Sequence, residues 1–212
     1  MGTGNKLLLI GGGGHCRSVL DCVLSTNHYQ HIGIIDNDSS ASALGIPVIG
    51  TDDDLLKLKN EGWTDAFISV GSIGSTVLRR KLYQMVNNMG FTVPSIIDPS
   101  AIFAKGTSFG KGVFVGKRVV VNTGSQIGTC AILNTGSIIE HDCIIGDFVH
   151  ISPGATLCGQ VAVGDDSHVG AGSVVRQGIQ IGSETVIGAG SVVVKDIPDN
   201  MKVYGNPCKA VE

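Results

Sequence analysis

Residues 138–173 read IIEHDC-IIGDFV-HISPGA-TLCGQV-AVGDDS-HVGAGS, and this stretch decides the fold. In each block of six, the second residue is apolar and the sixth is small or β-branched. The same pattern extends in both directions until it covers residues 96–197, which are 17 blocks without an insertion. A period of six fits neither the 3.6-residue turn of a helix nor the alternation of a long strand. It predicts a short strand and a turn, repeated along the chain.

Three such blocks make one coil of a prism, so 102 residues give between five and six coils. The apolar second positions then stack inside, and neighbouring coils rise by about 4.8 Å, the spacing of paired strands. Glycine follows the apolar residue in eight blocks. We expect the glycines of the repeat to take strained backbone positions at the corners. The repeat therefore predicts a β-helix domain, which we place at residues 96–212 with a closing loop at its C-terminal end.

The preceding residues, 1–95, have a different pattern. Apolar strands are predicted at residues 6–10, 31–36 and 66–70, and helices at residues 15–24, 52–60 and 75–89. Alternating strands and helices predict a small parallel sheet of the Rossmann type. The expected fold class is therefore an N-terminal Rossmann-like α/β domain followed by a C-terminal parallel β-helix.

A run of four glycines, residues 11–14, joins the first strand to the first helix. Such a turn presents backbone N–H groups and the helix dipole to phosphates. As a dinucleotide fingerprint the run is incomplete, because Cys16 stands at the third glycine position, although Asp36 suits a ribose hydroxyl. Three interpretations follow: an NAD site, a turn that only connects two elements, or a site for a nucleotide that is part of a substrate. We favour the third.

Composition restricts the partners. Lys and Arg number 15 against 18 Asp and Glu, which gives a net charge of −3. The chain therefore lacks the excess of positive charge that is typical of nucleic-acid-binding proteins. No stretch approaches the length of a membrane span, and the N-terminus does not resemble a signal peptide. The six cysteines show no CxxC pairing, so we expect reduced thiols in a cytoplasmic protein.

The motifs IGGGGHC at 10–16, IIDND at 34–38 and NTGSIIEHDCIIGDFVHISPGATLCG at 134–159 carry a family resemblance. The chain resembles the hexapeptide-repeat acyltransferases that act on sugars, namely the sialic-acid O-acetyltransferases and the bacillosamine-type UDP-4-amino-sugar N-acetyltransferases. The resemblance implies left-handed coils, a homotrimer and acetyl-CoA as cosubstrate. It implies an enzyme that N-acetylates a nucleotide-linked amino-sugar of the UDP-4-amino-4,6-dideoxy type for surface glycans. The closest alternative is O-acetylation of sialic acid or a related sugar.

The resemblance also assigns roles to residues. His141 corresponds to the proton acceptor and Asp142 to the carboxylate that raises its basicity. The contacts to acetyl-CoA correspond to His150, Gly159, Ala171 and Ala189. The contacts to the sugar nucleotide correspond to Gly13, Gly14, His15, Asp36, Asn37 and Gly71.

Chemistry supports the base, because a histidine with a pKa near neutrality accepts the proton of an attacking amine well. An 18-residue coil also predicts that His141 stacks on Gly159 and His150 on His168. The resemblance places His150 near the acetyl carbonyl of acetyl-CoA, where we expect it to donate a hydrogen bond to the thioester oxygen. The alternatives are a solvated turn histidine, a zinc site at His141, His150 and His168, and a non-catalytic trimeric nucleotide-sensing scaffold. We expect no metal.

Overall fold

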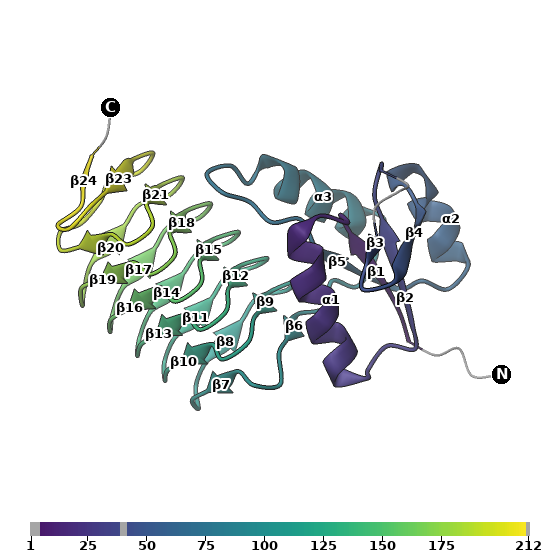
Figure 1. Cartoon of the computed structure of the whole chain (residues 1–212), viewed down its shortest axis with the longest axis horizontal. Helices are drawn as coiled ribbons and strands as arrows, with labels where there is room; N and C mark the ends of the chain where they lie inside the picture. Colours follow the sequence, from purple (N-terminus) through teal and green to yellow (C-terminus); the bar gives the residue numbers. More distant parts are fainter. Residues whose placement is uncertain (1–4, 39–41, 211–212) are drawn as a thin grey trace. The chain divides into compact units, whose positions relative to one another are not determined.

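The structure, a computed structural model, describes residues 5–38 and 42–210. The chain forms two compact units, and Figure 1 follows it from the α/β elements in purple and blue to the coils in teal and yellow. The first unit comprises the residues up to 71 together with residues 77–99. The second comprises residues 72–76 together with the residues from 100 onward. The short segment 72–76 therefore belongs structurally to the repeats.

The first unit contains a five-stranded sheet in the order β3-β4-β2-β1-β5. Strands β4, β2, β1 and β5 are parallel neighbours, whereas β3 pairs antiparallel with β4. The elements are β1 (Lys6–Ile10), α1 (Gly14–Thr26), β2 (His31–Ile35), β3 (Ser42–Ala43), β4 (Ile46–Gly50), the 3-10 helix η1 (Asp52–Asp54), α2 (Leu55–Asn60), β5 (Asp65–Ile68), α3 (Val77–Asn88) and the short strand β6 (Ile96–Ile97). The predicted α/β domain is confirmed.

Strand β1 lies between β2 and β5, and its residues from Leu7 to Ile10 are almost completely buried. This explains its unbroken aliphatic sequence, since a parallel strand covered on both faces shows no alternation. The β3–β4 hairpin was not predicted. Its segment contains Pro47 between Gly45 and Gly50, so it has the local composition of a loop.

The second unit is a left-handed parallel β-helix with three sheets along its sides (Figure 1). Each strand from β7 to β19 pairs in parallel with the strand 18 residues further on, as predicted; His150 pairs with His168, for example. At the C-terminal end the offset shortens to 16, where Val186 of β21 pairs with Lys202 of β23. One sheet contains β7 (Ile102–Phe103), β10 (Val120–Val121), β13 (Ile138–Ile139), β16 (Thr156–Leu157), β19 (Val174–Val175) and β22 (Val192–Val193). A second contains β8 (Ser108–Phe109), β11 (Gln126–Ile127), β14 (Ile144–Ile145), β17 (Ala162–Val163) and β20 (Gln180–Ile181). The third contains β9 (Phe114–Val115), β12 (Ile132–Leu133), β15 (His150–Ile151), β18 (His168–Val169), β21 (Val186–Ile187) and the closing hairpin β23 (Lys202–Tyr204) and β24 (Lys209–Ala210).

The β-helix core follows the sequence period. The second position of every block from Val115 to Val193 is buried, as is the sixth position from Val113 to Ser191. The fifth position has a positive φ in every block from residue 106 to residue 190, whether or not it is glycine. The expected strained glycines are therefore found at the fifth position, whereas the glycines at the third position have a different role. At Gly170, for instance, a Cβ would lie 2.5 Å from the backbone nitrogen of Ala189 in the next coil. Because glycine has no Cβ, these positions allow the backbones of neighbouring coils to approach closely.

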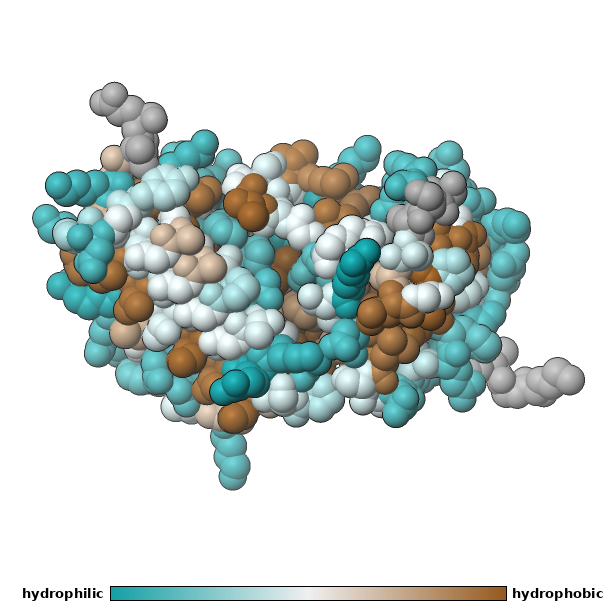
Figure 2. Space-filling view, viewed as in Figure 1, coloured by the Kyte–Doolittle hydropathy of each residue, from teal (hydrophilic) through white to brown (hydrophobic). Residues whose placement is uncertain are grey.

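The surface mixes polar and apolar residues. Figure 2 shows hydrophobic residues in several separate places among hydrophilic ones. Exposed aliphatic residues of the β-helix include Ile102, Ile144 and Val174. In the part of the chain that the structure describes, no helix has both the length and the apolar character needed to cross a membrane.

Candidate active site

The predicted base and its acid form a direct pair. His141 Nδ1 lies 3.0 Å from Asp142 Oδ2, and the two side chains are 45% and 57% exposed. Asp142 has φ 58°, the left-handed conformation that aspartate tolerates better than most residues. With Nδ1–H donated to the carboxylate, the Nε2 lone pair of His141 is available to accept a proton. An exposed pair adds little stability, so what the contact fixes is the tautomer and orientation of the ring.

The imidazole of His141 lies against Gly159 in the next coil. A Cβ on Gly159 would lie 2.5 Å from His141 Cε1, and Gly159 itself is buried. The predicted stack of these two residues is therefore confirmed. Gly159 gives the ring its place, because any side chain there would push the ring away.

A cavity of about 450 Å³ lies along the sheet that contains β15, β18 and β21. Its lining includes three of the four residues expected to bind the cosubstrate, His150, Ala171 and Ala189. Small residues at these positions leave room along the helix axis for an extended ligand. Gly159, the fourth, does not line this cavity but lies beneath His141. A single chain thus places the expected residues in two groups.

His150 is held at both ring nitrogens. Its Nδ1 donates to the carbonyl oxygen of Ser72 at 2.9 Å, and its Nε2 lies 3.3 Å from Asn134 Nδ2. The amide of Asn134 is oriented by the backbone N–H of Thr135, which donates to Asn134 Oδ1 at 2.8 Å. Asn134 Nδ2 is therefore the donor toward His150, and neutral His150 carries its proton on Nδ1. In this state Nε2 has no proton to donate to a thioester oxygen.

The segment 72–76 is fastened to the β-helix near both of its ends. His150 binds the carbonyl of Ser72, and the Thr76 hydroxyl hydrogen-bonds to Asp166. Between them Ile73 lines the cavity although its side chain is 80% exposed. Neither Asn134 nor this segment was among the predicted site residues, because the contacts join residues 16 and 78 positions apart.

The glycine turn of the first unit is braced by Asp36. Its Oδ2 accepts from the backbone N–H of Gly12 at 2.6 Å, and its Oδ1 accepts from that of Asp38 at 2.9 Å. Asp36 and Asn37 line a small pocket of about 160 Å³ with Gly11, beyond the carboxyl ends of β1 and β2. Ligands of open α/β sheets bind at such an edge.

The other expected nucleotide contacts lie around the same turn. Gly13 is the N-cap of α1 and Gly14 its first residue, and a Cβ on either would meet nothing within 4 Å. Gly71 approaches His15 closely, since a Cβ on Gly71 would lie 3.2 Å from His15 Cβ. Burial, and then the nearby charge of Arg79, lower the pKa of His15 from 6.5 to about 4. His15 is therefore neutral at physiological pH and offers a hydrogen bond, not a charge, to a ligand.

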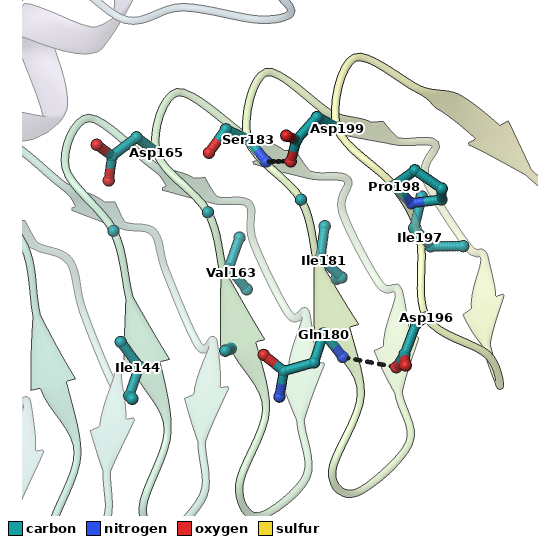
Figure 3. A pocket seen from close by; sticks show the side chains of 14 residues that line it. Ile144, Val163, Asp165, Gln180, Ile181, Ser183, Asp196, Ile197, Pro198 and Asp199 are labelled. Atoms are coloured by element: carbon teal, nitrogen blue, oxygen red, sulfur yellow. Dashed lines mark hydrogen bonds between the residues drawn. The ribbon is translucent and has the colours of Figure 1, made fainter.

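A larger and shallower hollow of about 680 Å³ lies over β14, β17 and β20 (Figure 3). Its acidic side chains bind backbone amides, as the dashed lines in Figure 3 show: Asp199 Oδ1 accepts from Ser183 N and Asp196 Oδ1 from Gln180 N. These carboxylates stabilise the corners of the coils. Within the described ranges, no three His, Cys, Asp or Glu side chains are grouped so that they would hold a metal ion.

Comparison with known proteins identifies the family of the chain. The PglD N-terminal domain family matches residues 6–86, and the bacterial transferase hexapeptide family matches residues 142–177 and 160–195. A histidine-to-asparagine variant of perosamine N-acetyltransferase from Caulobacter crescentus, solved in complex with CoA and GDP-perosamine, is 36% identical. The likeness covers 100% of this chain and 98% of that one, with a TM-score of 0.93. The chain belongs to the amino-sugar N-acetyltransferases of the hexapeptide-repeat family.

Other members of this family extend the likeness. The acetyltransferase domain of PglB from Neisseria gonorrhoeae, in complex with acetyl coenzyme A, is 37% identical, with a TM-score of 0.92. That likeness covers 98% of this chain and 100% of the domain. GDP-perosamine N-acetyltransferase from Escherichia coli O157:H7 is 31% identical over 90 residues, which are 42% of this chain and 41% of that protein. The expected family and fold class are thereby confirmed.

Proposed function

We propose that this chain transfers the acetyl group of acetyl-CoA to the amine of a nucleotide-linked sugar, with His141 as the general base. The observation that carries the proposal is the His141–Asp142 pair seated over Gly159. Its support from outside the chain is the likeness, over nearly the whole length, to N-acetyltransferases solved with CoA and GDP-perosamine.

The chemistry follows from the pair. The sugar amine attacks the thioester carbon of acetyl-CoA, a C–N bond forms, and the C–S bond breaks to release the thiolate of CoA. His141 Nε2 accepts the proton that the amine nitrogen loses and returns it to the thiolate. Asp142 stabilises the imidazolium that forms between these two steps.

In this proposal each domain binds one of the two substrates. The domain at residues 1–95 holds the nucleotide at its glycine turn, through Gly13, Gly14, His15, Asp36, Asn37 and Gly71. The β-helix at residues 96–212 holds acetyl-CoA along the cavity that contains Ala171 and Ala189. Two observations support this assignment. Asp36 accepts a hydrogen bond from Gly12 in the glycine turn, which is suited to phosphates, and Ala171 and Ala189 line the cavity on the β-helix.

The identity of the nucleotide is part of the proposal. Sequence motifs led us to expect a UDP-4-amino-4,6-dideoxy sugar, whereas relatives are named for GDP-perosamine. GDP-perosamine is therefore the first acceptor to test, with UDP-linked amino-sugars beside it. The product suits the biosynthesis of a surface glycan.

A homotrimer is the assembly that we propose. Exposed aliphatic residues on the coils, among them Ile102 and Val174, support it, because apolar side chains of this kind are suited to a subunit interface.

We also propose a cytoplasmic location, since all six cysteines are free thiols.

Release of free thiol from acetyl-CoA tests the function. The acceptors are GDP-perosamine, UDP-linked amino-sugars, the same nucleotide sugars with a hydroxyl in place of the amine, and free sialic acid. We expect turnover only with an amine acceptor. Turnover with sialic acid would replace N-acetylation by O-acetylation, and binding of a nucleotide without any turnover would favour the sensing scaffold.

A further inference from the structure

The corner of the β-helix beside the cavity repeats one hydrogen-bond arrangement in two successive coils. Asn134 and Ser152 occupy the same position of their blocks, and each reaches the histidine 16 residues further on. Asn134 Nδ2 lies 3.3 Å from His150 Nε2, and Ser152 Oγ lies 3.2 Å from His168 Nε2. Glycines 170 and 188 take this position in the next two coils and open the cavity.

The second arrangement differs from the first at the far nitrogen of the histidine. His150 Nδ1 has the Ser72 carbonyl as its acceptor, but His168 Nδ1 has no hydrogen-bond partner among the described residues. His168 is only 8% exposed and Ser152 only 4%. A buried N–H without an acceptor is costlier and rarer than a bare lone pair. The proton of neutral His168 therefore lies on Nε2, and the ring donates to Ser152.

Neutrality of His168 is consistent with its surroundings. Burial lowers its pKa, and its ring packs edge-to-face against His150 with the ring centroids 4.9 Å apart. Since Ser152 Oγ accepts from His168, the hydroxyl hydrogen of Ser152 remains to be donated elsewhere. Both residues line the cavity that holds Ala171 and Ala189.

We propose that the Ser152 hydroxyl donates a hydrogen bond to a carbonyl oxygen of the acyl-pantetheine arm, and that His168 is the positioning residue that orients this hydroxyl. The inference rests on the proposed function, since it takes the cavity to be the acetyl-CoA site. The oxygen belongs either to the thioester or to an amide of the arm, and the two are separated by experiment.

The test uses the full-length Ser152→Ala enzyme, with steady-state kinetics for acetyl-CoA and calorimetric binding of CoA, which has the amides but no thioester. A contact to the thioester oxygen predicts a kcat lower by about 10²-fold with CoA affinity unchanged, because that oxygen gains charge in the transition state. A contact to an amide predicts CoA affinity weaker by about 5- to 10-fold with kcat retained.

Ser167→Ala is the matched control, because the Ser167 hydroxyl is also buried but donates to the backbone carbonyl of Gly182 away from the cavity. We expect it to change thermal stability and not kcat. His168→Phe keeps an aromatic ring against His150 and removes the N–H. It should reproduce the loss of Ser152→Ala, and the double variant should lose no more than either single one.

Values of kcat and CoA affinity for Ser152→Ala within about twofold of the wild type would overturn the inference. If the losses of kcat or CoA affinity in the two single variants added up in the double variant, the coupling of Ser152 to His168 would also be overturned. Failure of the proposed function is recognised separately, because the wild type itself would then show no turnover with any amine acceptor.

Discussion

His141 and Asp142 are adjacent in sequence, yet Asp142 Oδ2 lies 3.0 Å from His141 Nδ1. Adjacent residues on a regular strand or helix do not face each other, and here the left-handed φ of Asp142 accompanies the contact. The fifth position of every block from 106 to 190 has this conformation, so the repeat itself supplies the corner at which Asp142 meets His141.

Two replacements of Asp142 should separate the effect of its negative charge on kcat from the effect of its hydrogen bond to His141. Asp142→Asn tolerates the left-handed conformation and keeps an oxygen that accepts from His141 Nδ1–H, but it lacks the charge that stabilises the imidazolium. We expect kcat to fall by about 10-fold. Asp142→Ala loses the acceptor as well and should lose more. Equal kcat for the Asp142→Asn enzyme and the wild type would show that the charge has no role.

Gly159→Ala should impair catalysis without unfolding the coil. The added methyl occupies the place of the His141 ring, whereas the φ of Gly159 is not in the left-handed region. The exposed imidazole swings outward, so kcat should fall by about 10²-fold, the order expected when a base is misplaced. Circular dichroism and the melting temperature check that the fold persists. Unchanged kcat would mean that the position of the ring against Gly159 is irrelevant.

The buried His15 should make stability depend on pH. Its folded pKa of about 4 lies below its ordinary value of 6.5, so the unfolded chain binds more protons between these values. Stability is therefore complete above pH 6.5 and falls as the pH drops toward 4. At about pH 5 the cost is about 2 kcal/mol. Urea unfolding should show a smaller loss between about pH 7.5 and about pH 5 for His15→Gln than for the wild type, and identical losses would contradict this origin.

The two groups of site residues predict a site shared between subunits. One chain puts His150, Ala171 and Ala189 in a cavity that neither His141 nor Gly159 lines. Trimers refolded from equal amounts of His141→Ala and His150→Ala chains should recover activity, in about a quarter of the sites if each site takes one group from each neighbour. Each variant alone is the control. Mixed trimers as inactive as both parents would place the whole site in one subunit.

The β-helix could be predicted well from the sequence because its period is local. An aliphatic second position and a small sixth position determine which side chains turn inward, and both are buried throughout the middle coils. The stacks of His141 on Gly159 and of His150 on His168 follow from the 18-residue coil.

The hydrogen bonds of His150 could not be predicted in this way. Its tautomer is determined by the carbonyl of Ser72, 78 residues away, and by the amide of Asn134, whereas its contact with acetyl-CoA stays a prediction. No local pattern indicates a contact with a segment so distant in the sequence. The sequence does contain one signal of these contacts. Asn134 and His150 are 16 residues apart, and so are Ser152 and His168.

The most direct test of the proposed function compares wild type with His141→Ala on one amine acceptor, GDP-perosamine, with intact-mass and NMR identification of the product. We expect the wild type to form an amide on the sugar nitrogen. His141→Ala should bind CoA and the nucleotide sugar as tightly as the wild type, and its kcat should be lower by about 10²- to 10⁴-fold. An acetyl group found on oxygen would exclude N-acetylation, and full activity of His141→Ala would exclude His141 as the general base.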